Sequence, residues 1–372
     1  MKTRNLILTG IFCLLLVIPQ WVGSSEFSGA EEPQKLYNPV STEYLKKNFR
    51  RSQPRLVLNS DLEKQVKAKL KSDPVIQNTY RAIQANATEI QKKPLLERKL
   101  EVHRLLGVSR EMLYRMNMLG MVYRIDKDSK ILKRINEEVI AVCNFTEWNP
   151  SHYLDVAEIS MAEAIAFDWT TGKLAKSTID LAKTALIKKG IKPSWPENGK
   201  NPGWVYGTNN WNQVCNGGMI AASITIAEKD PELAAKTIHR ALDGMVHALV
   251  EYQPDGVYPE GSTYWSYGTS FTVVTAAMLE SAFSTDFGIA DYPGLKESAV
   301  YRVLMNTPSG WYYNFADCGD KRSAGGDVTL AWFASKNGNK AFFEKERFSD
   351  PHFRFGRTVA DFRSGIGLAF AV

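Results

Sequence analysis

Helical segments of two kinds alternate along most of this chain, and the alternation restricts the folds open to it. After an extended start that ends near residue 58, apolar residues recur at helical spacing, with capping residues or helix breakers between the segments. No convincing run of strands interrupts them. The spacing predicts helices near residues 61–93, 97–126, 129–143, 151–170, 173–189, 211–228, 231–252, 269–285, 293–306 and 327–337. We therefore expect an all-α protein.

The two kinds of helix differ in where their apolar residues lie. Segments 151–170 and 214–227 are apolar on nearly every side, which is typical of buried helices. Segments 173–189 and 231–252 carry Lys, Glu and Asp on one face, as helices of an outer layer do. Alternating inner and outer helices predict an (α/α)n toroid, an incomplete barrel of helical hairpins around a central cleft. No clear sequence repeat supports this independently.

The first 30 residues read as a secretory leader. They hold Lys2 and Arg4, then a largely apolar run from Leu6 to Pro19, then small residues from Gly23. No later stretch reaches the roughly 18 uninterrupted apolar residues of a membrane span. We expect a secreted or periplasmic protein, with no membrane association in its mature form. The expected parts are a signal peptide over 1–24, an extended lead-in over 25–55, the toroid over 56–345 and a C-terminal tail over 346–372, either natural or shortened.

The net charge of the chain indicates which classes of ligand it can bind. The chain has 46 Lys plus Arg against 40 Asp plus Glu, a net charge of +6, and loss of Lys2 and Arg4 with the leader leaves +4. This mild excess suits a polyanionic substrate, but it is too weak and too unclustered to indicate nucleic acid.

The cysteines outside the leader, Cys143, Cys215 and Cys318, show no CxxC spacing and no partner histidine. We therefore expect no zinc or other metal and no cofactor. Their apolar surroundings favour buried free thiols over one disulfide.

Two long polar and aromatic interruptions are expected to be functional loops. They are Lys192–Asn210 (KPSWPENGKNPGWVYGTNN) and Gln253–Gly268 (QPDGVYPEGSTYWSYG). Aromatic side chains stack on the flat faces of sugar rings, so these loops indicate a glycan cleft. The candidates for sugar contact are Trp204, Tyr206, Trp211, Tyr258, Tyr264, Trp265 and Tyr267. The alternative is that these aromatic residues only fasten the loops to the helices.

Asn209 and Asn210 precede the apolar helix that begins near Trp211, with Asn212 one residue inside it. Free amides and the positive end of the helix dipole can hold an anion there, although simple capping is the alternative.

Tyr264 is the most interesting ionisable side chain, because a tyrosine with positive charge or donors beside it can shuttle a proton. His152 begins an inner helix and shares a broad face with Asp155 and Glu158, which could line a cleft.

Three segments together resemble the heparinase II/III-like and alginate lyase group of polysaccharide lyases, in particular its smaller, single-toroid members that act on polyuronates. They are SHYLDVAEISMAEAIAFDW, GTNNWNQVCNGGMIAAS and PDGVYPEGSTYWSYGTSF, within a likeness that covers roughly residues 55–337. The resemblance implies an α/α toroid and cleavage of an acidic polysaccharide, alginate, mannuronan or glucuronan, by β-elimination.

The resemblance also implies roles for particular residues. Asn209 or Asn210 would neutralise the uronate carboxylate, and Tyr264 would donate a proton to the leaving oxygen. His152, Glu260 and Arg322 are candidates for tuning or positioning that tyrosine. Many relatives have a histidine in the Asn block where this chain has Trp211, so the base stays unassigned. The C-terminal β-sandwich of larger relatives is not expected here.

Two other functions remain open. A glycoside hydrolase on the same toroid, such as an unsaturated uronyl hydrolase, needs a carboxyl acid, for which Asp155, Glu260 and Asp317 are available. A non-catalytic glycan-binding protein would use the aromatic loops alone.

Overall fold

The computed structural model describes residues 33–320, 327–343 and 364–372, and the unit considered below is Gln34–Val372. Its helices are α1 (Thr42–Asn48), α2 (Ser60–Ser72), α3 (Pro74–Lys92), α4 (Leu106–Asp126), α5 (Ser129–Cys143), α6 (Tyr153–Thr170), α7 (Lys176–Ala185), α8 (Asn210–Ile226), α9 (Pro231–Leu249), α10 (Gly261–Phe283), α11 (Ser298–Leu304), α12 (Val328–Lys336) and α14 (Ser364–Phe370). Short helical turns are η1 (Leu186–Ile191), η2 (Lys192–Ser194), η3 (Gly203–Tyr206), η4 (Val250–Tyr252) and η5 (Lys340–Phe342).

The all-α prediction is confirmed for the described part of the chain. Its β-structure is limited to two isolated bridges, Glu101 with Arg104 and Asn306 with Tyr312. None of the described helices is long and apolar enough to cross a bilayer.

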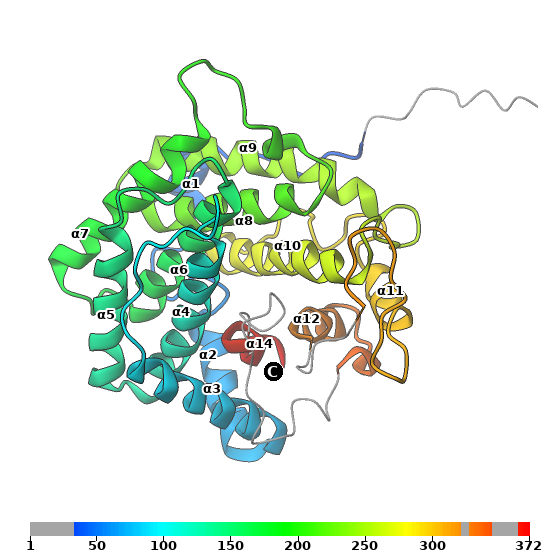
Figure 1. Cartoon of the computed structure of the whole chain (residues 1–372), viewed down its shortest axis with the longest axis horizontal. Coiled ribbons are helices and arrows are strands. Elements are labelled where there is room, and N and C mark those ends of the chain that lie inside the picture. The colour runs from blue at the N-terminus through cyan, green and yellow to red at the C-terminus, as the bar shows by residue number, and fades with distance from the viewer. Residues whose placement is uncertain (1–32, 321–326, 344–363) are drawn as a thin grey trace, which may run out of the picture. The chain divides into compact units, whose positions relative to one another are not determined.

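Inner and outer helices alternate as the sequence predicts. Helices α4, α6, α8 and α10 pack each against the next, while α5, α7 and α9 cover them from outside (Figure 1). Every residue of α6 is buried, which matches its apolar composition on all sides. The described unit is therefore an (α/α) toroid, as predicted.

The inner helices run in the same direction. Near their N-termini, Arg110 of α4 faces Glu158 of α6, with Nε 3.5 Å from Oε1. Near their C-termini, Arg124 of α4 donates to the carbonyl oxygen of Trp169 in α6 at 3.3 Å. The first turns of the inner helices consequently lie at one end of the unit.

Several expected helices have different bounds, beginning with the first two. The segment 61–93 divides at Asp73, whose side chain caps α3 by accepting from the amides of Val75 and Ile76. Pro74 has no amide hydrogen to continue α2 and suits the first turn of α3. The segment 97–126 becomes helical only at α4.

Helix α10 begins at Gly261 and not near residue 269, so Tyr264, Trp265 and Tyr267 lie on a helix and not on a loop. Gly261 has φ +78°, which glycine adopts without strain. A Cβ there would also lie 2.6 Å from Cβ of Cys318. The glycine therefore allows the chain to turn sharply into α10, whose start the apolar spacing did not reveal.

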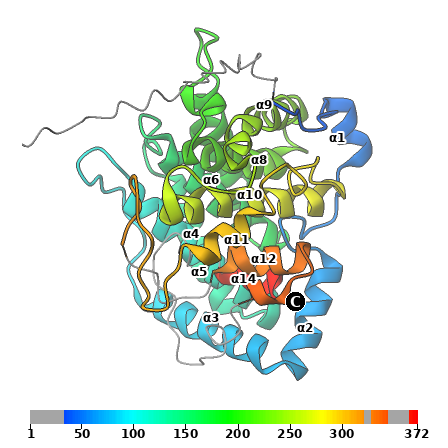
Figure 2. The same cartoon turned by 90° about the vertical axis from the view of Figure 1, so that its right-hand side faces the viewer.

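Both ends of the described unit contain a helix that the sequence analysis did not predict. The predicted lead-in contains α1, and Asn38 beside it donates to the carbonyl oxygen of His239 in α9 at 2.9 Å. In the predicted tail, α14 packs on α12 and α4, with the Ile366 amide donating to Oδ1 of Asn117 at 2.9 Å (Figure 2). The predicted signal peptide lies outside the described residues.

The prediction of buried free thiols is confirmed for Cys143, Cys215 and Cys318.

Candidate active site

Three side chains from the first two turns of α4, α6 and α10 join these helices. The hydroxyl of Tyr267 donates to Oε1 of Glu158 at 2.6 Å. The guanidinium carbon of Arg110 lies 5.2 Å from the centre of the Tyr267 ring, and Arg110 Nε lies 3.5 Å from the same Glu158 oxygen. We call Arg110, Glu158 and Tyr267 the inner triad.

The inner triad is fixed by burial and charge. Glu158 is fully buried, and its Oε2 atom has no hydrogen-bond partner within the part of the chain that the structure describes. Burial raises the pKa of the Glu158 carboxyl to about 6, in spite of Arg110 and Tyr267. Burial and the neighbouring Glu158 also raise the pKa of Tyr267 well above its ordinary value. Tyr267 therefore stays protonated and positions Glu158.

His152 immediately precedes α6 and forms a pair with Asp155. Its Nδ1 lies 3.0 Å from Oδ1 of Asp155, while Oδ2 accepts from the Leu105 amide and from Nδ2 of Asn149, both at 2.7 Å. A carboxylate that accepts on both oxygens requires the hydrogen on Nδ1, which leaves the lone pair on Nε2. The imidazole is thus oriented to accept a proton at Nε2.

The start of α8 meets both neighbouring helices. Trp211 places its ring 4.9 Å from that of His152, in an edge-on arrangement. Asn210 donates from Nδ2 to Oε2 of Glu260, just before α10, at 3.0 Å. The Oδ1 atom of Asn210 is buried and has no hydrogen-bond partner among the described residues. Structure therefore brings His152, Asn210, Trp211 and Glu260 to the same end as the inner triad.

Tyr264 stands one turn before Tyr267 on α10 and is half-buried. Its hydroxyl has no hydrogen-bond partner within the described residues. Tyr258 and Tyr267 are only 2% and 4% exposed, and both hydroxyls donate to other side chains. Of these three tyrosines, Tyr264 is the one that a ligand can reach without displacing the core.

Several other predicted site residues make contacts typical of structural residues. Asn209 caps α8, its Oδ1 accepting from the Trp211 amide at 3.1 Å. Asn212 donates to the carbonyl oxygens of Val205 and Gly244, both at 2.8 Å. Tyr258 donates to Oε1 of Gln213 at 3.2 Å. Their predicted roles in catalysis or substrate binding stay predictions.

Two of the tryptophans predicted to contact sugar, Trp204 and Trp265, are buried in the protein. Trp204 stacks on Tyr153 with ring centres 4.7 Å apart and is 8% exposed. Trp265 is fully buried beside Phe333.

Tyr206 lies against α9, outside the cluster of first turns. It is 43% exposed and packs edge-on against His247 at 5.3 Å. With Trp195 and Arg240 it lines a pocket of about 600 Å³. The first aromatic loop therefore contributes Trp204 to the core and Tyr206 to this outer pocket.

Arg322, predicted as a catalytic candidate, lies outside the described residues. Arg110 was not predicted. The sequence offered no local signal for it, because the expected helix began near residue 97 and placed Arg110 well inside it, whereas α4 begins at Leu106.

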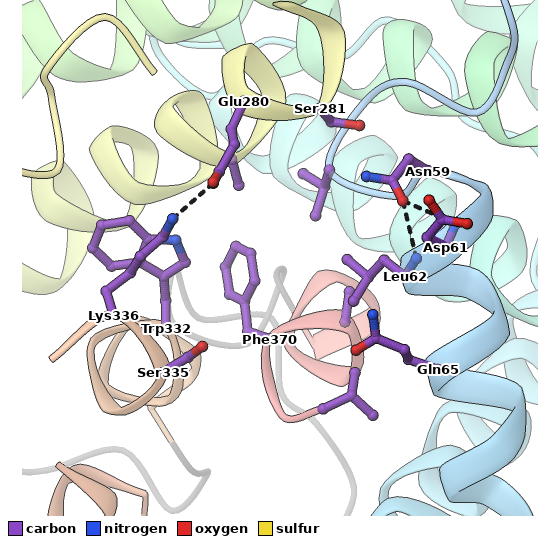
Figure 3. A pocket seen from close by; sticks show the side chains of 14 residues that line it. Asn59, Asp61, Leu62, Gln65, Glu280, Ser281, Trp332, Ser335, Lys336 and Phe370 are labelled. Atoms are coloured by element: carbon purple, nitrogen blue, oxygen red, sulfur yellow. Dashed lines mark hydrogen bonds and ion pairs between the residues drawn. The ribbon is translucent and has the colours of Figure 1, made fainter. Parts of the chain in front are cut away.

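A different pocket, of about 400 Å³, opens near the C-terminal end of α10 (Figure 3). Trp332 and Phe370 form part of its wall, and Lys336 pairs with Glu280 at 2.8 Å. None of the predicted site residues lines it.

Comparisons with known proteins agree with the fold. The chain resembles the crystal structure of an alginate lyase from Bacteroides ovatus, with a TM-score of 0.54 and 10% identity over 84% of this chain and 98% of that chain. A structure of an alginate lyase A1-III variant complexed with a tetrasaccharide matches with a TM-score of 0.46 and 14% identity, over 79% of this chain and 95% of that chain. Neither the scan against protein-family models nor the search of curated proteins finds a match. The predicted resemblance to the alginate lyase group is thus confirmed at the level of the fold.

Proposed function

We propose that this protein is a polysaccharide lyase that cleaves a uronic-acid-containing polysaccharide by β-elimination, with alginate, mannuronan or glucuronan as its substrate. The observation that carries the proposal is that an oriented imidazole, His152, and a reachable tyrosine, Tyr264, lie at the same end of an alginate-lyase-like toroid, and that the tyrosine hydroxyl has no partner among the described residues. The leader-like first residues support export to the periplasm or beyond.

The reaction needs one proton acceptor and one donor. His152 Nε2 takes the proton from C5 of the uronate, and the electron pair of that bond forms the double bond between C4 and C5. The bond from C4 to O4 breaks, and the Tyr264 hydroxyl gives its proton to the departing O4. No water is consumed. Asp155 holds the imidazole and balances the charge that it gains.

We assign the amide groups less direct roles than the resemblance implies. Asn210 already donates to Glu260, and the side-chain oxygen of Asn209 caps α8. Asn210 therefore acts by holding Glu260 and the start of α10 in place, next to Tyr264.

Absorbance of the conjugated product tests the proposal. The purified protein is mixed with alginate, glucuronan, heparin and hyaluronan, and the ultraviolet absorbance of the unsaturated uronate is followed. A lyase makes the absorbance rise. An unsaturated uronyl hydrolase lowers the absorbance of a pre-cleaved substrate, and a binding protein changes neither. A fall, or no change on every polymer, contradicts the proposal.

A further inference from the structure

We infer that Arg110, which no sequence motif marks, is the residue that binds the uronate carboxylate and so selects acidic over neutral or esterified sugars. The identity of the ligand as a uronate rests on the proposed function. The position and availability of the guanidinium rest on the geometry alone.

The guanidinium is held on one side and open on the other. Its partners within the described residues are Glu158 and Tyr267. The side chain of Arg110 is 31% exposed, whereas that of Glu158 is fully buried. An arginine has five N–H donors in a fixed planar fork, a geometry that matches a carboxylate. As far as the described residues go, the outer donors of Arg110 have no other partner and can take a second anion.

Charge around Arg110 keeps the cation in place. Burial lowers the pKa of Arg110, but the Glu158 carboxylate and the Tyr267 hydroxyl outweigh it and raise the pKa above its ordinary value. The N-termini of the inner helices add partial positive charge at the same end, which does not favour the cation itself but favours binding of an anion beside it. Asp155 is a second carboxylate at this end of the helices. Its oxygens already make hydrogen bonds with His152, Asn149 and the Leu105 amide.

The position of Arg110 in the inner triad also places a bound uronate carboxylate near the proposed proton donor. Tyr267, under the Arg110 guanidinium, is one helical turn from Tyr264 on α10. A uronate held by Arg110 thus lies beside the proposed proton donor. Neutralising the carboxylate stabilises the enolate-like state that forms when the C5 proton leaves.

Glu158 provides a variant with the opposite effect. Its carboxylate competes with the substrate for Arg110, and an amide can still accept from Tyr267. Glu158→Gln should therefore tighten binding of an acidic sugar, whereas Arg110→Met should weaken it. If the pair served only to hold α4 against α6, both variants would lose binding together.

The experiment measures binding without turnover. Calorimetry is done with a mannuronate oligosaccharide and with its methyl ester, on protein that also carries Tyr264→Phe. With Arg110 present, the acid should bind about 10- to 100-fold more tightly than the ester, as expected for a charge-assisted arginine pair. Arg110→Met should bring this ratio close to one and leave ester binding unchanged. Arg110→Lys, which keeps the charge and loses the fork, should give an intermediate ratio, and melting curves check that each variant is folded.

The outcomes separate the two proposals. If Arg110→Met and Arg110→Lys keep the full preference for the acid, or if Glu158→Gln weakens binding as Arg110→Met does, the inference about Arg110 is wrong and the lyase proposal is unaffected. If the preference depends on Arg110 but the protein with Tyr264 intact forms no unsaturated product, the lyase proposal fails and the carboxylate site stands. Absence of binding to the acid overturns the inference, and the product assay then decides the lyase proposal by itself.

Discussion

The imidazole of His152 lies edge-on against the indole of Trp211, with the ring centres 4.9 Å apart. Trp211 occupies the place in the Asn block where many lyases of the resembling group have a histidine. Here the histidine comes from the residue before α6 and reaches the start of α8 from the neighbouring helix. His152, from a different segment of the chain, is thus the histidine that lies beside this block.

The pairing of His152 with Asp155 leads to a first prediction. His152→Gln removes the proposed base and should lower turnover by about 10²- to 10⁴-fold with little change in oligosaccharide binding. Asp155→Asn should also lower turnover, because an amide can donate to Nδ1 and so favour the wrong tautomer. Initial rates and binding are measured for both, with His247→Gln on the outer helix α9 as the matched control. Full turnover by His152→Gln would remove His152 from the mechanism.

The two neighbouring asparagines should behave differently. Asn209→Ala loses the cap of α8 and should cost about 1 kcal/mol of folding free energy, with turnover nearly unchanged. Asn210→Ala releases Glu260 beside the start of α10 and should lower turnover more than stability. Urea unfolding and initial rates of both variants check this. The sequence analysis also allows Asn209 to bind the substrate carboxylate through its side-chain amide. A large loss of turnover by Asn209→Ala would support that role and contradict the present prediction.

Glu163, on α6, should make stability depend on pH. It is fully buried beside the Cys143 thiol, and burial raises the pKa of its carboxyl to about 8 in spite of the hydrogen bond with that thiol. Because this folded-state pKa lies above the unfolded value, the folded protein binds the extra proton. Stability should therefore fall as pH rises toward about 8, by up to about 1.4 kcal/mol per pH unit.

The range between about pH 6 and pH 8 isolates Glu163, because the pKa values of Glu158 and Asp168 are each about 6. The free energy of unfolding in urea is measured across this range for the natural protein and for Glu163→Gln. The variant should show the smaller slope. Equal slopes would mean that Glu163 is already ionised in the folded protein.

Much of the fold could be predicted from apolar spacing. The segment that became α6 is apolar on every side, and only an inner helix can bury such a surface. The start of α10 could not be predicted, because Pro259, Gly261 and Gly268 read as loop residues and the contact of Gly261 with Cys318 is distant in sequence.

Residue type singled out Tyr264 from Tyr258 and Tyr267 as the candidate proton shuttle, but the exposure of the three hydroxyls could not be read from the sequence. It depends on where the chain turns into α10 and on which side of that helix Tyr264 and Tyr267 lie. Arg110 was missed because nothing local distinguishes it from other arginines. Its meaning depends on Glu158 and Tyr267, which come from two other helices.

The central claim, that Tyr264 carries the departing proton in an elimination, is tested most directly by the absorbance of unsaturated product formed by Tyr264→Phe. Phenylalanine keeps the ring and its packing, so only the hydroxyl is lost. The account predicts a loss of about 10²- to 10⁴-fold in rate on the polyuronate that the natural protein cleaves, with binding nearly unchanged. Tyr258→Phe, which removes a buried hydroxyl from the same segment, should be much milder. A Tyr264→Phe protein that keeps more than about a tenth of the natural rate, a barrier change under about 1.4 kcal/mol, would contradict the account.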